Sequence, residues 1–309
     1  MNIIVILFFS EFTVLNKIDF MKSEMPALVP FALPEVSEAA AKGSLREVYA
    51  DIRQVMRLPM VNLIYRHLAT QQATLERVWN ALRPHFASGA VDTAAAQLRS
   101  EVESIVKAME VAPRGSRSSP PSFEPAILEV VEAYLLGNSQ NLVALSALLL
   151  ARGAPASADG NGNSAYATLP YPQPQPQPQP LRPLPDFRDL DDVTRARIHR
   201  LNRVADEPEP AVVASLYRHL ALWPQSLAAA EDLLEELEQR NTLRNARDAT
   251  VAAARELLMQ QPLQLSALGD EFNRSFGRTL GHFATVTIPK MLPIGTALLL
   301  SWRTPPAIP

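Results

Sequence analysis

The same five residues, Tyr-Arg-His-Leu-Ala, occur twice in this chain, first at 65–69 and again at 217–221, 152 positions later. The apolar residues around the first copy also return at the same offset. Val61, Ile64, Leu68, Leu75 and Leu82 are matched by Val213, Leu216, Leu220, Leu227 and Leu234. A fixed offset without gaps indicates an internal repeat. A chain of 309 residues is long enough for two such units, each with apolar residues to bury.

The apolar residues recur with helical spacing, and no convincing strand pattern occurs. Ser44 and Glu47 have the spacing of a capping box, which predicts a helix from Ser44 to about Leu58, because Pro59 disfavours a helical residue before it. Pro59 itself suits the first turn of a second helix. Further helices are predicted after a break at 70–74, over 92–110 and over 124–150. The predicted fold class is all-α, with two repeats of a helical module forming an intramolecular pseudo-dimer.

The predicted organisation has four segments: an N-terminal extension (1–27), a first helical repeat (28–151), a Pro/Gln-rich linker (152–186) and a second helical repeat (187–309). Alternating Pro in the linker favours extended polyproline II at about 3.1 Å per residue, so 170–185 spans roughly 50 Å. Such a tract serves either as a spacer or as a ligand for Pro-binding domains, and we favour the spacer.

Residues 1–20 begin with the apolar run Ile3–Phe9, which resembles a short signal peptide. No Lys or Arg precedes the run and no A-x-A site follows it. Two interpretations stay open. Either Met21 or Met25 is the true start, or residues 1–20 form a short apolar tail.

The composition excludes several classes of site. The chain has no Cys, which rules out disulfides, thiolate nucleophiles, Cys–zinc sites and iron–sulfur clusters, and which fits a reducing, cytoplasmic location. None of the glycine-rich phosphate-binding motifs is present, and the five His residues lack ligand spacing. A net charge of −3 gives no reason to expect nucleic acid as a partner. We therefore expect no metal, no cofactor and no membrane partner, since the apolar run near Pro293 is short and interrupted.

A ligand pocket is expected between the two repeats, where domains often bind small molecules. The repeated pairs Arg66-His67 and Arg218-His219 could bind a carboxylate and shuttle a proton, with Tyr65 and Tyr217 beside them. Their presence in both copies favours a structural role, in which each Arg pairs across the interface between the repeats. The acidic residues Asp189, Asp191 and Asp192 are interpreted as helix-start acids.

Asn138 follows Gly137 in the middle of a strongly apolar stretch. A buried amide must find hydrogen-bond partners, in the packing or in a site. Asn138 is therefore a candidate functional residue.

Several short motifs resemble the group I 2-haloacid dehalogenases, the DehI family. The resemblance covers nearly the whole chain from about residue 28, except for the linker. Its motifs are Val48–Arg53 (VYADIR), Arg57–Pro59 (RLP), Arg66, Leu68–Thr70 (LAT), Ala133-Tyr134 with Gly137-Asn138, Arg203–Asp206 (RVAD), and Ala221 with Trp223-Pro224.

This resemblance implies an all-α pseudo-dimer without a cofactor. The implied reaction replaces the halide on C2 of a short 2-haloalkanoic acid by water, with inversion and without a covalent ester. An Asp acts as the base on the water and an Asn helps to hold it. An amide that orients water beside a carboxylate base suits direct displacement.

Carried over by position, the water-holding Asn falls on Asn138, the Ser before the base on Ser215, and the base itself on Leu216. The aromatic pocket walls of the first repeat fall on Met60 and Leu63. Leu216 cannot accept a proton, and the acids Glu207 and Glu209 lie nearby in sequence.

Three hypotheses follow. The chain is a hydrolase acting on carbon–halide bonds through another base, an enzyme with different chemistry on a small carboxylic acid, or a non-catalytic binding or interaction protein on the same fold. A buried carboxylate at the pocket would favour the first. A pocket lined by Leu216 and Met60 without an ionisable group would favour the third. A homodimer is compatible with all three.

Overall fold

The chain forms an all-α structure, as predicted. The computed structural model describes residues 33–109, 124–151, 178–205, 212–265, 268 and 270–303, and no strand occurs among them. The first half contains α2 (Gly43–Met56), α3 (Leu63–Leu68), the short 3-10 helix η1 (Ala69–Gln71), α4 (Gln72–Ala87), α5 (Ala90–Ala108) and α6 (Pro125–Ala151). The second half contains η3 (Phe187–Asp189), α7 (Asp192–Arg203), α8 (Ser215–Leu220), α9 (Pro224–Gln239), α10 (Thr242–Gln260), α11 (Asp270–His282), the π-helical segment η4 (Phe283–Thr287) and α12 (Ile288–Arg303).

Three consecutive helices of the first half return in the second half at one constant offset. Helices α8, α9 and α10 begin 152 residues after α3, α4 and α5, and they have the same lengths of 6, 16 and 19 residues. The offset is the one at which the Tyr-Arg-His-Leu-Ala sequence repeats. After α5 and α10 the halves diverge. The first half continues with the single helix α6, whereas the second half continues with α11, η4 and α12.

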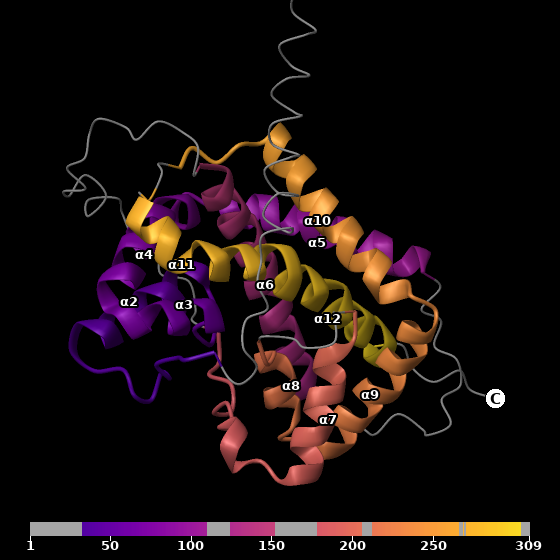
Figure 1. Cartoon of the computed structure of the whole chain (residues 1–309). Coiled ribbons are helices and arrows are strands. Elements are labelled where there is room, and N and C mark those ends of the chain that lie inside the picture. The colour runs from indigo at the N-terminus through magenta and orange to yellow at the C-terminus, as the bar shows by residue number, and fades with distance from the viewer. Residues whose placement is uncertain are drawn as a thin grey trace, which may run out of the picture.

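The core is shared by both halves. Helix α6 packs against α12, α5, α10, α11 and α8, and α10 also packs against α5 and α12. Figure 1 shows α12 crossing the middle of the molecule in front of α6, with α5 and α10 lying along the upper side. The buried apolar residues of the described chain join into one cluster that runs through both halves. Neither half therefore buries its apolar surface by itself.

Helix α6 and the continuous run Phe276–Arg303 are each long and apolar enough to cross a membrane, although 78% of each apolar window is buried inside the fold. The expectation that the apolar run near Pro293 is short and interrupted was wrong, because the helix continues through Pro293. Proline removes one backbone donor from a helix. Here the surrounding helices bury Pro293 on all sides and hold the segment helical.

Two expectations about helix ends are wrong. Helix α2 starts at Gly43, so Ser44 lies inside the first turn and makes no capping bond; its Oγ instead accepts from Gln72 Nε2 at 2.7 Å. The helix ends at Met56, where Arg57 adopts a left-handed conformation, and Pro59 lies before α3 rather than in its first turn. The expectation that Asp191 lies at the start of a helix is confirmed. It caps α7 and accepts from the Thr194 backbone N–H at 2.9 Å.

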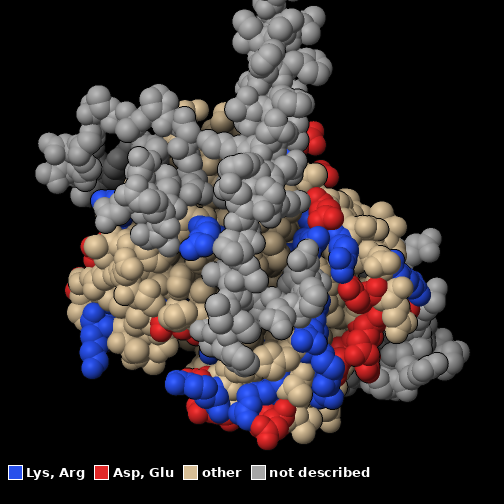
Figure 2. Space-filling model, in the orientation of Figure 1, with Lys and Arg blue, Asp and Glu red and all other residues tan. Residues whose placement is uncertain are grey.

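The described end of the linker, residues 178–186, is attached to the second half. The Arg182 carbonyl accepts from His219 Nε2 at 2.6 Å, and the Arg182 guanidinium lies 4.9 Å from the centre of the Trp223 ring. The Pro185 carbonyl accepts from Arg218 Nη2 at 2.8 Å. The N-terminal extension and the rest of the linker lie outside the described residues. On the face shown in Figure 2, described basic and acidic side chains are interspersed, most densely in the lower part around α7 and α9.

Candidate functional site

A small cavity lies where α3, α6 and α8 meet η4 and α12, so both halves contribute to its wall. Its volume is about 40 Å³. Four residues that the sequence singled out line it: Leu63 from α3, Asn138 from α6, and Ser215 and Leu216 from the start of α8. The cavity therefore brings these four side chains together, although they are up to 153 positions apart in the chain.

Three amide side chains face this cavity, those of Asn62, Asn138 and Asn141. Asn138 and Asn141 lie three residues apart on α6 and so share one face of the helix. Asn62 is at the N-cap position of α3, yet its side chain makes no capping bond. It packs instead against Gly137, where an added Cβ would lie 2.8 Å from its Nδ2. Gly137 is thus required for the close approach of this amide to α6.

Two of these amides have unpaired oxygens. Asn62 and Asn141 are 5% and 1% exposed, and neither Oδ1 has a hydrogen-bond partner. Leaving a buried acceptor unpaired costs roughly 1–3 kcal/mol. A hydrogen-bonding molecule in the cavity would remove this cost, as buried water does in many proteins.

Tyr134 also lines the cavity, and its hydroxyl lies 3.1 Å from His219 Nδ1. The Arg182 carbonyl can only accept, so His219 Nε2 carries the proton in the 2.6 Å contact between them. The Nδ1 atom of neutral His219 then accepts from the Tyr134 hydroxyl. Burial lowers the pKa of His219 and raises the pKa of Tyr134 to about 12, so both groups are neutral at pH 7.

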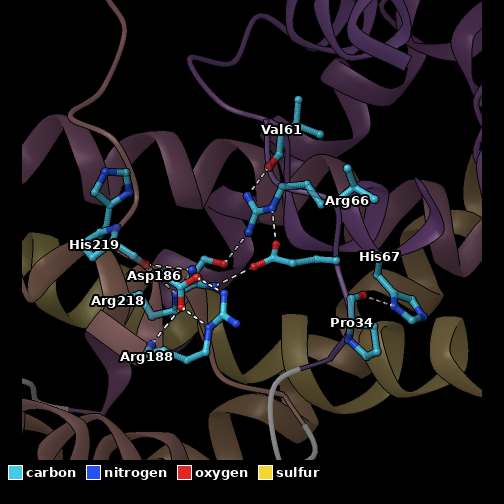
Figure 3. Close-up of polar contacts among 12 residues, drawn as sticks. Pro34, Val61, Arg66, His67, Asp186, Arg188, Arg218 and His219 are labelled. Atoms are coloured by element: carbon cyan, nitrogen blue, oxygen red, sulfur yellow. Dashed lines mark hydrogen bonds and ion pairs between the residues drawn. The ribbon is translucent and has the colours of Figure 1, made fainter. Parts of the chain in front are cut away.

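An ion-pair cluster, drawn in Figure 3, is joined to the cavity wall through Ser215. Glu35 accepts from Arg66 Nε at 2.5 Å and from Arg218 Nη1 at 3.0 Å. Arg66 also donates to the Val61 carbonyl at 2.6 Å and to Ser215 Oγ at 3.2 Å. The two repeated arginines therefore meet on one carboxylate, and Arg66 touches a residue of the cavity. This geometry agrees with the structural role expected for the repeated pairs.

Burial alone would raise the pKa of Glu35, but the charges and hydrogen bonds of Arg66 and Arg218 outweigh it and hold the pKa below its ordinary value. Glu35 is therefore ionised at pH 7. One carboxylate and two guanidinium groups leave the cluster with a net charge of +1 beside the cavity.

Other predicted residues lie away from the cavity. Met60 is buried at 6% exposure but does not line it. Tyr65 is fully buried with its ring 5.9 Å from that of Trp79, and Tyr217 is buried in the matching place of the second half. His67 Nδ1 lies 2.7 Å from the Pro34 carbonyl (Figure 3). Glu207 and Glu209 lie outside the described residues.

Among the described residues that line the cavity, Tyr134 is the only ionisable one, and no carboxylate faces it. The described part of the chain also has no group of three or more His, Asp or Glu side chains placed to hold a metal ion. The chemistry visible at the cavity is therefore hydrogen bonding by neutral amides and hydroxyls.

Sequence reasoning missed Asn62, Asn141 and Glu35. The spacing of Asn141 from Asn138 is a signal that could have identified it. Asn62 and Glu35 carry no such signal, because tertiary contacts alone bring them to α6 and to the repeated arginines. The π-helical turn η4, which supplies Phe283 and Thr287 to the wall, was also unexpected, and turns of this kind occur often at functional sites.

No protein-family model matches the chain. Over 82 residues, 26% of its length, it is 34% identical to an (R)-2-haloacid dehalogenase of Pseudomonas putida. The match spans 27% of that relative.

Solved structures of a D-2-haloacid dehalogenase resemble the whole fold. A mutant has a TM-score of 0.60 at 15% identity over 90% of this chain and 98% of the other. The complex of a mutant with D-2-CPA has a TM-score of 0.59 over the same shares. The complex with L-LA has a TM-score of 0.60 and covers 99% of that chain. The chain thus has the all-α fold of the D-2-haloacid dehalogenases, with sequence similarity to an (R)-2-haloacid dehalogenase over about a quarter of its length.

Proposed function

We propose that this chain is a DehI-type dehalogenase-like protein that binds a short 2-substituted carboxylic acid in the cavity between its repeats and does not itself displace the halide. One observation carries the proposal. The cavity contains Asn138 together with Leu216, and no carboxylate faces it among the described residues. An alkyl side chain at the position of the base can bind the carbon chain of a ligand but cannot take a proton from water.

The electrostatics beside the cavity support a carboxylate ligand. The cluster of Glu35, Arg66 and Arg218 has a net charge of +1, and Arg66 reaches the cavity wall through Ser215 Oγ. A positive charge in a partly buried position attracts an anion more strongly than the same charge in water. The amides of Asn62, Asn138 and Asn141 would supply the hydrogen bonds.

The size of the cavity limits the ligand. A volume of about 40 Å³ is close to the roughly 30 Å³ that one water molecule occupies in the liquid. Leu216, which is 2% exposed, takes up part of the available space. Binding of even a three-carbon acid therefore requires side chains of the wall to move.

A second candidate function is hydrolysis of the carbon–halide bond with a different base. The likeness to D-2-haloacid dehalogenase structures over 90% of this chain favours it. In that case the base would have to come from outside the described wall, and Glu207 and Glu209 are the carboxylates nearest in sequence to Leu216.

The test is halide release from D- and L-2-chloropropionate by the wild type and by Leu216→Asp. A carboxylate at position 216 would take a proton from water. The water oxygen would then bond to C2 as the C–Cl bond breaks and chloride leaves with the electron pair. We expect no release by the wild type and release at least about 10²-fold above background by Leu216→Asp, the usual size of a general-base effect.

Ile64→Asp is the matched control. Ile64 is the repeat equivalent of Leu216 and lines the same cavity. The variant Ile64→Asp therefore adds an equal negative charge on the side of the first repeat. It should remain inactive, and Asn138→Ala in the Leu216→Asp background should reduce release again. Release by the wild type would refute the proposal in favour of the second candidate. If folded Leu216→Asp releases no halide and the wild type shows no binding of 2-chloropropionate by calorimetry, both readings fail.

A further inference from the structure

A second, larger cavity is separate from the inter-repeat cavity. It has a volume of about 620 Å³ and lies between α5, α6 and α12, with residues 178–181 of the linker along one side. Ligand pockets for small organic molecules typically measure about 300–1,000 Å³. Nothing in the proposed function uses this space.

The apolar part of the wall comes from leucines on two helices and the linker, namely Leu135, Leu136, Leu181, Leu299 and Leu300. Four of these five lie on α6 and α12, the helices at the centre of the fold. A wall of this kind removes an alkyl or aryl body from water, at about 25 cal/mol for each Å² buried.

Three arginines line the same cavity, and they differ in their partners. Arg57 forms an ion pair with Asp92, and Arg303 forms one with Glu132. Arg99 has neither. Its Nη1 donates to the neutral Ser139 hydroxyl at 2.9 Å, and no described carboxylate lies within ion-pair distance of it. Arg99 is therefore a cation facing the cavity that has no ion-pair partner among the described residues.

The environment of Arg99 supports this assignment. Burial lowers the pKa of Arg99, with no neighbouring charge acting to restore it. A half-buried guanidinium without a counter-ion is costly, and a planar carboxylate matches its donors in a two-bond arrangement. Three acidic residues also line the cavity, and they do not oppose such a ligand. Glu103 is paired with Lys107. Glu132 is neutralised by Arg303, and Glu129 is exposed to solvent.

We infer that this cavity binds an amphipathic monocarboxylate, with its head group on Arg99 and its apolar body along the leucines of α6 and α12. Charge complementarity and the apolar wall together select this class. A neutral lipid would leave Arg99 without a partner. A dianion would exceed the single unpaired cation of the wall.

The probe is decanoate, titrated by calorimetry into the wild type, Arg99→Gln and Arg303→Gln, with decanol as the neutral ligand of equal chain length. We expect saturable 1:1 binding of decanoate, weakened about ten-fold or more in Arg99→Gln, since a charged hydrogen-bonded pair contributes about 1.5–3 kcal/mol. Arg303→Gln should stay within about two-fold, because its charge is already paired. Decanol should bind the wild type more weakly than decanoate.

Arg99→Lys separates charge from fold. It keeps the cation and should retain more of the affinity than Arg99→Gln, while thermal unfolding shows that each variant is folded. Absence of saturable decanoate binding by the wild type would overturn the inference. Equal affinities in wild type and folded Arg99→Gln, or a larger loss in Arg303→Gln, would overturn it as well. Halide release plays no part in these readouts, so the result is independent of the proposed function.

Discussion

Glu35 connects the two repeats through a single side chain. Its carboxylate receives Arg66 from the first half and Arg218 from the second, and the Arg66 side chain is only 5% exposed. Removing one partner of a buried ion pair is far more harmful than never having the pair, because the remaining charge stays desolvated. Here two guanidinium groups would lose the carboxylate with which both form ion pairs.

Glu35→Gln should therefore lower the free energy of unfolding at pH 7 by about 3–5 kcal/mol. The measurement is urea unfolding followed by circular dichroism. Glu103→Gln is the control, since Glu103 forms an exposed ion pair with Lys107 one helical turn away and its loss should cost less than about 1 kcal/mol. A loss in Glu35→Gln no greater than in the control would contradict a stabilising role for the cluster.

The same variant gives a pH dependence. The pKa of Glu35 is lowered in the folded protein, so its stabilisation is fully present above the unfolded carboxyl pKa of about 4.3. It is lost as the pH falls through the lower, folded pKa. The difference in unfolding free energy between wild type and Glu35→Gln should accordingly shrink between pH 5 and pH 2. A difference that stays constant over that range would show that Glu35 acts by shape and not by charge.

At the scale of the element, α6 separates the two cavities. It presents Asn138 and Asn141 to the inter-repeat cavity, and Leu135 and Leu136 to the larger one. Its buried residues lie all around its circumference, as expected for a helix enclosed on every side. The helix is held at the first cavity by the contact between Gly137 and Asn62.

Gly137→Ala tests this contact. An alanine normally stabilises a helix interior by about 1 kcal/mol relative to glycine. Here its Cβ would lie 2.8 Å and 2.9 Å from the two amide atoms of Asn62 and 3.0 Å from Leu58 Cδ1. Overpacking of this kind typically costs about 1–3 kcal/mol, so we expect a net loss of stability.

Asn62→Ala combined with Gly137→Ala completes the thermodynamic cycle, measured by thermal unfolding. The alanine at 137 should be tolerated better once the amide is gone, which gives a positive coupling between the two sites. Additive effects would show that Asn62 yields to the new methyl group without cost and that Gly137 has another role.

At the scale of the whole molecule, the two halves share one core. Helix α6 packs against α8, α10 and α12 of the second half, and α5 packs against α10 and α12. Helix α6 is the most apolar of the described helices, and its main packing partners include helices of the other half. The repeats are therefore parts of one cooperative unit, and the proposed pseudo-dimer could not come apart into stable monomers.

A fragment comprising residues 28–151 should accordingly lack fixed tertiary packing when expressed alone. We expect helical far-UV circular dichroism with a weak near-UV signal and binding of the dye ANS, since the faces of α5 and α6 that contact α10 and α12 would be exposed. A fragment of 187–309 is the reciprocal sample, and mixing the two should restore the near-UV signal. Cooperative unfolding of either fragment alone would refute the shared core.

The sequence by itself determined the fold class, most of the helices and the repeat, because these depend on local spacing of apolar residues. Helices α8 to α10 begin 152 residues after α3 to α5, which is the offset of the sequence repeat. The apolar stretch around Asn138 pointed to that residue, and the family resemblance pointed to Leu63, Ser215 and Leu216; the structure brings all four to one cavity. Local signals failed where burial outweighs them, as at Pro293, which lies inside a helix, and at Ser44, which does not cap one.

Only the tertiary structure decided what surrounds these residues. Asn62 comes to Gly137, Glu35 to both repeated arginines, and Arg99 to a cavity wall where it has no ion-pair partner among the described residues. Such contacts join residues far apart in the chain, and no spacing rule of a helix encodes them. They depend on how α6 and α12 are enclosed by the other helices, and that arrangement is fixed by the burial of apolar surface over the whole molecule.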